Sequence, residues 1–499
     1  MKRLLSAVLC LIVLIGSTAC SNDFLTLDTL DFPKESLTVD SSVPEVKEPE
    51  SKDGVFERNG FSTGYARVDI TPSNSVILGG FPNAHLRYSK RVADRLYVSC
   101  VAISDGEKIA LFFSYDNLNV QTYFRNQVAK LVEKDLGVPK ELVWITATHS
   151  HHAPMLGSSS NNSIIRHLTE LYPAFRQCAK RAVETLDQSE IYIGKTETVG
   201  LNYVRRYVSV LDGSWVGGND TPSNSDPAKV RHESIADPEM QIIKFDRKNA
   251  KDIVMVNWQS HYTGSGLENE EISASWVAGF REKAEKELGV DFAFYQGAAG
   301  NVVVGSKLKG ENSGRSYMTQ GHLLADALIS GMGSLKKIEP GKISGVIKME
   351  TVTYNKDTEG LDLNIAKQIS ELYATDTAAA SRLVSQYGFD SYFHAHYMYV
   401  RSRYEADTRD IEICAIRIGS IGFASAPYEM FHENGSQVKE GSPYEMTFMC
   451  AYTNGSHGYI PARASFPNRG YEVVSCYFVP GTGEQVANSL LELLNGLNG

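Results

Sequence analysis

The stretch VWITATHSHHAP, residues 143–154, joins a run of apolar and β-branched residues to three histidines within four positions. Such a run is typical of a buried strand, in which side chains alternate between two faces. If the strand continues, His149 and His151 share one face and His152 lies on the other. Two imidazoles side by side at a strand end can bind one metal ion. The alternative is a polar loop whose histidines only form hydrogen bonds.

The segments around this stretch alternate between short apolar runs and longer amphipathic ones. Strands are predicted over residues 96–105, 108–118, 141–149, 252–261, 291–296 and 411–427, and helices over 124–137, 163–186 and 273–289. This alternation predicts an α/β fold with a large mixed sheet. Residues 358–409 differ, because they are helical in pattern, charged and aromatic, and they are interpreted as a possible helical insertion that covers part of the molecule.

The first 19 residues have the pattern of an export signal. Lys2 and Arg3 precede an apolar run over residues 4–15, and small residues then lead to Cys20. This pattern resembles a bacterial lipoprotein signal, although Ser17 stands where leucine is usual. We therefore expect an exported protein of the bacterial cell envelope, in the outer membrane or periplasm, anchored to the membrane by lipid on Cys20. The alternative is ordinary secretion with a coincidental cysteine.

Composition divides the remainder into two parts. Residues 20–60 are rich in Ser, Asp, Glu, Pro and Lys, which predicts a disordered tether. Residues 61–499 have the composition of a globular domain large enough for an extensive core. The net charge of −10, without basic blocks, argues against nucleic acid as a partner. Five cysteines remain in this part, and their odd number without a C-x-x-C spacing predicts buried thiols rather than a disulfide framework.

Further side chains that can bind a metal follow other apolar runs. His261 closes IVMVNWQSH, and Glu429 follows IGFASAP in residues 421–427. Tyr459 and Tyr471 lie in GSHGYIPARASFPNRGYEV, residues 455–473. Strand ends are where α/β folds gather functional side chains. Two imidazoles and a carboxylate around an open position match a catalytic zinc site.

Five motifs in order resemble the neutral/alkaline non-lysosomal ceramidase family, whose members are zinc-dependent amidases. They are GYARVDITP (64–72), THSHHAP (148–154), NWQSH (257–261), APYEMF (426–431) and the pair of tyrosines. The resemblance covers nearly the whole globular part. It implies the mixed-sheet catalytic domain of that family, without the C-terminal immunoglobulin-like domain of known ceramidases. It also implies Zn²⁺ as the cofactor and a small-molecule amide or lipid as the substrate.

The resemblance further implies a role for each site residue. The zinc ligands would be His149, His261, Glu429 and Tyr459. His151 would be the general base, Tyr471 a transition-state hydrogen-bond donor, and Arg205, or else Arg206, the active-site arginine. Zinc lowers the pKa of its bound water to around 7, a base then removes the proton, and donors stabilise the oxyanion.

The chain also departs from the family pattern. In GNVVVG, residues 300–305, Asn301 replaces an aspartate and Val303 a serine. These changes leave a metal centre in place and put ceramide itself in question. The predicted function is therefore hydrolysis of an amide, with N-acylated lipids as the leading substrate class. The alternatives are a zinc hydrolase of another amide or ester, such as an acylated sugar or peptide, and a surface binding protein without catalysis.

Two other histidine clusters have competing interpretations. His394 and His396 form a second H-x-H in a helical setting, where they point apart, and we expect surface or lid residues. His432 and Glu433 follow Glu429 at helical spacing and are alternative ligands if all three share one helix.

Overall fold

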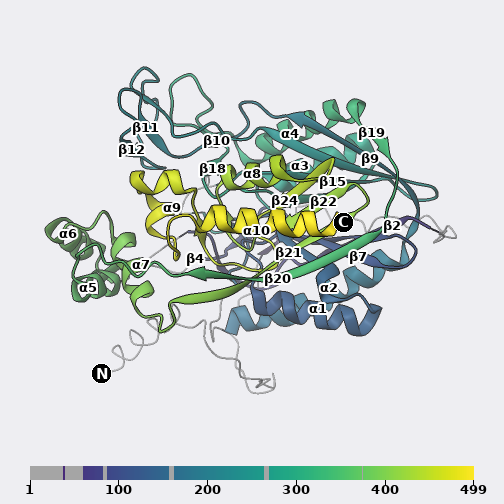
Figure 1. Cartoon of the computed structure of the whole chain (residues 1–499), viewed down its shortest axis with the longest axis horizontal. Coiled ribbons are helices and arrows are strands. Elements are labelled where there is room, and N and C mark those ends of the chain that lie inside the picture. Colours follow the sequence, from purple (N-terminus) through teal and green to yellow (C-terminus); the bar gives the residue numbers. More distant parts are fainter. Residues whose placement is uncertain are drawn as a thin grey trace.

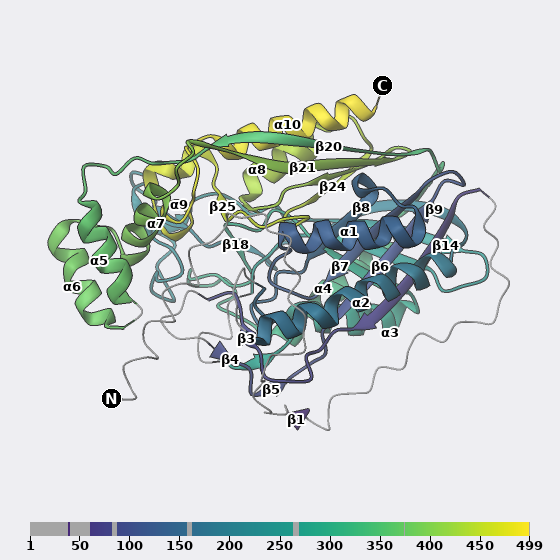
Figure 2. The same ribbon diagram turned by 90° about the horizontal axis from the view of Figure 1, so that it is seen from below.

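The fold is a layered arrangement of two sheets packed face to face with helices outside both. The computed structural model describes residues 60–81, 87–156, 162–262, 269–373 and 375–498, together with the short strand β1 (Thr38–Val39). In Figure 2 the layers run from α10 through the smaller sheet and the larger sheet to α2 and α3. The prediction of an α/β fold with a large mixed sheet is confirmed.

The larger sheet has nine strands. In spatial order they are β17 (Asp291–Gln296), β15 (Ile253–Trp258), β14 (Glu239–Arg247), β9 (Asp187–Glu197), β2 (Ser62–Asp69), β6 (Tyr97–Ser104), β7 (Ile109–Tyr115) and β8 (Val143–Ala147), with β19 (Lys336–Ile338) paired to β9. The pairs β15/β17 and β7/β8 are parallel, and the others are antiparallel. The two predicted strands that lead to histidines, β8 and β15, both lie in this sheet.

The smaller sheet covers one face of the larger one. It consists of β20 (Ile343–Thr353), β21 (Thr408–Ile418), β22 (Ile421–Ser425) and β24 (Met446–Cys450), with β22 and β24 parallel. Aromatic rings join the sheets: Phe112 of β7 lies 4.5 Å from Phe423 of β22, measured between ring centroids. The next residue, Phe113, points the other way and packs on Phe175 of α2. Successive side chains of β7 thus fill two different cores, as strand alternation requires.

Helices cover the outer faces. Those on the larger sheet are α1 (Thr122–Leu136), α2 (Asn162–Glu184), α3 (Trp276–Leu288) and α4 (Tyr317–Gly331), and those on the smaller sheet are α8 (His432–Gly441) and α10 (Thr482–Leu497). Helix α1 ends as predicted at Gly137, whose φ of 69° suits glycine. All five cysteines of the globular part are buried and free, which confirms their interpretation as core residues.

The predicted insertion is present between β20 and β21, and only its last two positions, 408 and 409, belong to β21 instead. It contains α5 (Leu363–Tyr373), α6 (Thr377–Tyr387) and α7 (Tyr392–Ser402), and the chain returns to the sheet at Thr408, where β21 begins. Figure 1 shows α5 and α6 at the left end of the molecule, with α7 beside the single-turn helix α9 (Tyr471–Val474).

Small groups of short strands position the loops between the sheets. Three of them are pairs: β10 (Tyr203–Val204) with β18 (Val302–Val303), β23 (Glu429–Met430) with β25 (Tyr459–Ile460), and β3 (Ile77–Leu78) with β4 (Arg87–Tyr88). Two are three-stranded: one consists of β11 (Tyr207–Ser209), β12 (Trp215–Gly217) and β13 (Val230–His232), and the other of β1, β5 (Arg91–Val92) and β16 (Glu271–Ile272). Within the described residues, no helix is both long and apolar enough to cross a membrane. The predicted signal peptide and nearly all of the tether lie outside the described residues.

Candidate metal centre

The predicted ligands lie in segments that follow strands of both sheets. His149 follows β8 and His261 follows β15, while Glu429 follows β22 and Tyr459 follows β24. The two latter residues are direct partners in the parallel pair β23/β25. The chain therefore brings together four positions from distant parts of its sequence at one edge where the two sheets meet.

Three imidazoles converge at this edge. His149 Nε2 lies 2.9 Å from His261 Nε2 and 3.1 Å from His151 Nε2. The carboxylate Oε2 of Glu429 lies 3.1 Å from His261 Nε2 and 3.4 Å from His149 Nε2. All three histidines are at most 5% exposed. The nitrogens of this trio are close enough together to ligate one ion.

The hydrogen bonds of the outer ring nitrogens define which nitrogens are free. His149 Nδ1 donates to the carbonyl oxygen of Leu118 at 2.8 Å, and His261 Nδ1 donates to that of Ala299 at 2.7 Å. A carbonyl can only accept, so each neutral ring carries its proton on Nδ1 and a lone pair on Nε2. Two lone pairs then face each other at 2.9 Å with no proton between them. A cation between them removes this repulsion, and backbone carbonyls are usual outer partners of metal-binding histidines.

Burial keeps the imidazoles in the form that binds metals. It lowers the pKa of His261 to about 3, with further lowering by Arg205 and His149. Burial, together with the neighbouring histidines, also lowers the pKa of His151 well below 6.5. For Glu429, burial raises the pKa, and the facing histidines lower it through a proton between their Nε2 atoms and the carboxylate, which is the place that a cation would take. Neutral imidazoles beside an ionised carboxylate form a donor set suited to Zn²⁺.

His149 adopts a strained backbone conformation. Its φ is 62°, in the left-handed region that residues other than glycine seldom occupy. Such a conformation costs about 1–3 kcal/mol and persists where surrounding contacts impose it. Here the backbone amides on either side are fixed, because Thr148 N donates to Tyr115 O and Ser150 N donates to Asn117 O. The strain turns the His149 ring toward His261.

The tyrosines and Arg205 form a second group beside the imidazoles. Arg205 Nη2 donates to Tyr459 Oη at 3.1 Å, and Arg205 Nε lies 2.8 Å from Glu472 Oε1. Burial and then Glu429 raise the pKa of Tyr459 well above 10, whereas Arg205 acts in the opposite direction. The ring of Tyr471 packs edge-on against that of Tyr459, with centroids 5.7 Å apart. The seven predicted residues thus lie in one neighbourhood.

The comparisons with known proteins concern this fold. No protein-family profile and no curated protein sequence matches the chain. A crystal structure of neutral ceramidase from Pseudomonas aeruginosa superposes with a TM-score of 0.66 at 15% identity, covering 88% of this chain and 74% of that one. A structure of a ceramidase complexed with C2 superposes equally well, covering 88% and 75%.

The chain has the fold of the neutral ceramidases.

Within this ceramidase fold, Asn301 has a structural role that the sequence did not reveal. Its Nδ2 donates to Glu433 Oε2 at 2.9 Å, and its Oδ1 accepts from the backbone N–H of His432 at 3.0 Å. Asn301 therefore holds the first residues of α8. Glu433 also accepts from Ser234 Oγ, and His432 Nε2 lies 3.0 Å from the same hydroxyl. His432 and Glu433 are thus engaged with Ser234 and Asn301, and they do not share a helix with Glu429, which lies in β23.

The structure also places the alternative arginine and the second H-x-H. Arg206 pairs with Glu233 and Glu472 and packs on Trp215, so Arg205 is the arginine that reaches Tyr459. His394 lies in α7 of the insertion and is 2% exposed, so of the two expectations, surface or lid, the surface position is excluded for this residue. Its ring lies 3.0 Å from Arg469 Nη2, a contact that strand and helix periodicity cannot predict.

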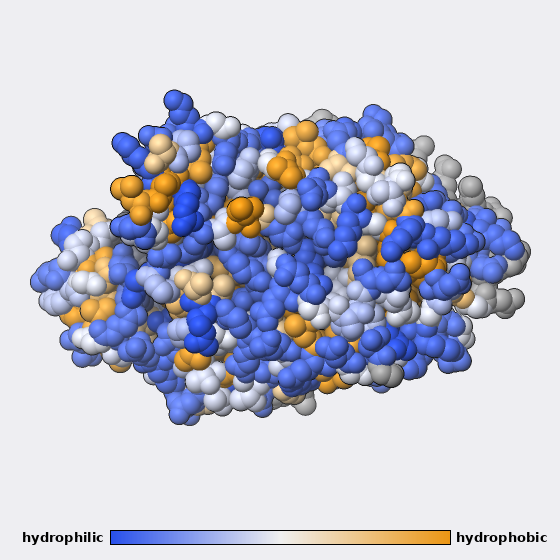
Figure 3. Space-filling view, turned by 45° about the horizontal axis from the view of Figure 1, so that its top comes forward, coloured by the Kyte–Doolittle hydropathy of each residue, from blue (hydrophilic) through white to orange (hydrophobic). Residues whose placement is uncertain are grey.

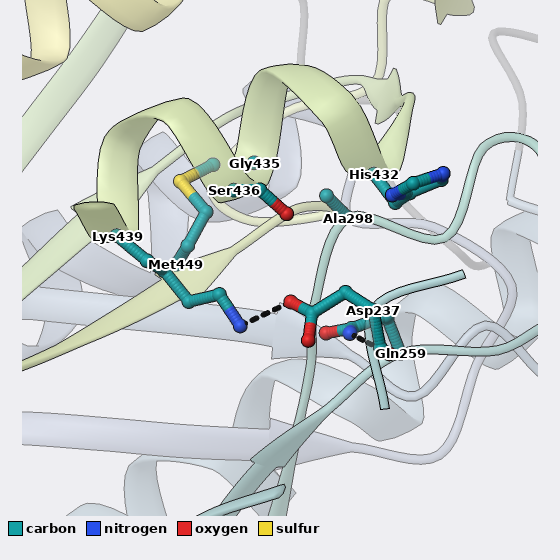
Figure 4. A pocket seen from close by; sticks show the side chains of 8 residues that line it. All are labelled: Asp237, Gln259, Ala298, His432, Gly435, Ser436, Lys439 and Met449. Atoms are coloured by element: carbon teal, nitrogen blue, oxygen red, sulfur yellow. Dashed lines mark hydrogen bonds and ion pairs between the residues drawn. The ribbon is translucent and has the colours of Figure 1, made fainter. Parts of the chain in front are cut away.

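A small pocket lies elsewhere in the ceramidase fold. Figure 4 shows its lining, in which the ammonium of Lys439 is paired with the carboxylate of Asp237 beside Gln259 and His432. It has no room for a water-sized molecule. None of the seven predicted site residues lines it, so it is a packing gap under α8 and does not serve as a substrate site.

Proposed function

We propose that the protein is a zinc-dependent hydrolase that cleaves an amide bond, with an N-acylated lipid as its substrate. The observation that carries the proposal is the 2.9 Å separation of the Nε2 atoms of His149 and His261, whose Nδ1 atoms both face backbone carbonyl oxygens, within a ceramidase fold. His149, His261, Glu429 and Tyr459 would hold the ion. When bound, zinc supplies a Lewis acid and an acidified water.

The other residues act on the reacting groups. His151 is buried and its pKa lies well below 6.5, so it is neutral; its Nε2 faces His149 Nε2 at 3.1 Å, and this is the nitrogen that would accept a proton at the centre. The same position also makes His151 a candidate third imidazole ligand. Metal content separates the two roles, because removal of a ligand lowers the zinc content and removal of a base does not. Arg205 and Tyr471 are donors placed to stabilise an oxyanion. Arg205 is charged, and Glu472 fixes its guanidinium.

Exposed apolar residues support a lipid substrate. The hairpin β11–β12 follows Arg205 and Arg206 directly, and Val210, Leu211 and Val216 on it are 43%, 93% and 43% exposed. Figure 3 shows a mainly hydrophilic surface on which hydrophobic residues form several small groups, one of them at the upper left, on the end of the molecule where this hairpin lies. Exposed apolar groups near a site are typical of contact with lipid or protein.

The decisive experiment is an assay of purified protein against ceramide, N-acyl amines, N-acyl amino acids, acylated sugars and simple esters. Each substrate is tested with zinc and with a chelator. We expect chelator-sensitive amide cleavage and stoichiometric zinc. With Val303 in place of serine, we expect ceramide to be turned over more slowly than another N-acylated lipid. Cleavage of esters or acylated sugars alone would favour a zinc hydrolase of another amide or ester. A protein that contains no zinc and turns over no substrate would instead be a binding protein with this fold.

A further inference from the structure

The helical insertion has a small core of its own and one helix that faces the candidate centre. Side chains of α5, α6 and α7 pack together around Ala366, Ile369, Ala380, Ala395 and Met398. Figures 1 and 2 both place α7 between this group and α9. Helix α7 therefore has one face in the insertion core and another toward the segment that carries Tyr471.

Three residues of α7, each four positions apart, contact that segment. The ring of Phe393 packs edge-on against Tyr471, with centroids 4.9 Å apart. Tyr397 lies between Phe393 and Arg401 on the same face. Burial, followed by the neighbouring Tyr471, raises the pKa of Tyr397 well above 10, which places the two tyrosines next to each other. Arg401 Nη1 donates to the carbonyl oxygens of Val474 and Cys476 at 2.9 and 2.7 Å. Residues at this spacing lie along one helix face, so the contacts form a continuous stripe.

The turn before Tyr471 is also fixed by the insertion. Arg469 Nη1 lies 2.6 Å from Glu359 Oε2, and its Nε pairs with Asp390. Arg469 Nη2 lies 3.0 Å from His394 Nε2. These contacts come from the segment before α5 and from the region around the start of α7.

Helix α9 needs such support. It has four residues, Tyr471–Val474, which is a single turn. A single turn is unstable by itself, because its few hydrogen bonds do not offset the cost of nucleation. The orientation of Tyr471 is therefore set by the contacts that α7 and the Arg469 cluster make.

We propose that Tyr397 is a positioning residue that donates its hydroxyl proton to Tyr471 Oη, which leaves the Tyr471 O–H free to point at the reacting group. This inference rests on the proposed function and adds to it, since it makes the insertion part of the catalytic apparatus. Hydrogen bonds in series strengthen one another, so a donor behind Tyr471 also makes Tyr471 a better donor.

The test compares four variants of the full-length zinc protein: Tyr397→Phe, Tyr399→Phe, Tyr471→Phe and the double variant of Tyr397 and Tyr471. Tyr397→Phe removes the hydroxyl and keeps the ring. Tyr399→Phe is the matched control, because its ring packs against the core of the insertion on the same helix. We expect Tyr397→Phe to lower kcat about fivefold, the effect of one hydrogen bond, with KM, zinc content and melting temperature unchanged. Tyr399→Phe should match wild type. The double variant Tyr397→Phe/Tyr471→Phe should be no slower than Tyr471→Phe alone.

A second readout does not depend on turnover. With 3-fluorotyrosine incorporated at position 471, the fluorine resonance should shift in the Tyr397→Phe background and stay in place in the Tyr399→Phe background. An unmoved resonance would overturn the hydrogen bond, and additive losses in the double variant would overturn action through Tyr471. If wild type cleaves no amide and the resonance still shifts, the proposed function fails while the contact stands, and Tyr397 then has no catalytic role.

Discussion

Substitution of His149 is the most direct test of the candidate centre. It is in contact with both other imidazoles, and the ring of Tyr452 packs on it at 4.1 Å between centroids. We expect His149→Ala to lose zinc and turnover while the fold stays intact, because the residue lies beyond the end of β8 and the backbone hydrogen bonds of Thr148 and Ser150 on either side remain.

The control is His152→Ala, which removes a neighbouring buried imidazole whose two nitrogens have no partner within the described structure. Elemental analysis of both variants, with circular dichroism to confirm folding, makes the comparison. The control should retain zinc. Wild-type occupancy in His149→Ala would remove this residue from the ligand set.

At the residue scale, the identities in the site were predictable and the geometry was not. Strand alternation put His149 and His151 on one face of an extended segment, yet β8 ends at Ala147 and a left-handed residue follows. The rings meet because of the turn. Its conformation depends on backbone bonds to Tyr115 and Asn117, which local sequence does not encode. The ligand role of each residue and the identity of the ion remain predictions.

At the element scale, the start of α8 depends on a neutral amide at position 301. Burial would raise the pKa of Glu433, but His432 and Ser234 hold it at about 2, so this carboxylate is charged at neutral pH. Asn301→Asp replaces a donor to Glu433 with a second carboxylate. We expect a loss of roughly 1–3 kcal/mol in the free energy of unfolding at pH 7.

The pH dependence has a definite sign. Repulsion from Glu433 raises the folded pKa of an aspartate at 301 above its unfolded value near 4. The deficit is therefore small below that value and grows as the pH rises through the folded pKa. Melting curves at pH 5 and pH 8 measure it. Adding Glu433→Gln should restore a donor and most of the stability, and an Asn301→Asp protein as stable as wild type at both pH values would contradict this account.

The elements that were predicted lie within a few residues of the observed ones, among them α1, α3 and the insertion, whereas β9, β14, β20, β24, α4, α8 and α10 were not predicted. The role of α7 was also not predictable. Phe393, Tyr397 and Arg401 form an ordinary helical stripe, and sequence alone cannot distinguish a stripe that faces a core from one that faces α9. For the same reason the sequence could not decide between surface and lid for His394, whose partner Arg469 is 75 residues away along the chain.

At the scale of the whole molecule, the fold class was predictable and the order of strands was not. Alternating strands and helices indicate a mixed sheet, but β2 pairs with β9 only across a long stretch of chain. That the sheet order matches a ceramidase fold became visible only in three dimensions, since the sequence identity is 15%.

Attachment of the whole protein to a membrane is a separate proposal, based on Cys20 after the apolar run. Cys20→Ser should move the protein from the membrane fraction to the soluble fraction. The multiple acyl chains of a lipoprotein give stable attachment, whereas a single chain binds weakly. Cys10→Ser is the matched control, because it lies inside the apolar run. Unchanged fractionation of Cys20→Ser would count against lipidation.

The position of the centre between two sheets has a consequence for how the protein is made. The strands of the larger sheet all precede β20 in the chain, and those of the smaller sheet begin with it. His149 and His261 therefore leave the ribosome long before Glu429 and Tyr459. With the proposed ligand set, a newly made chain has half of its metal donors until its last strands have docked. Loading of the proposed metal would then be a late event, which occurs only in chains whose two sheets have both assembled.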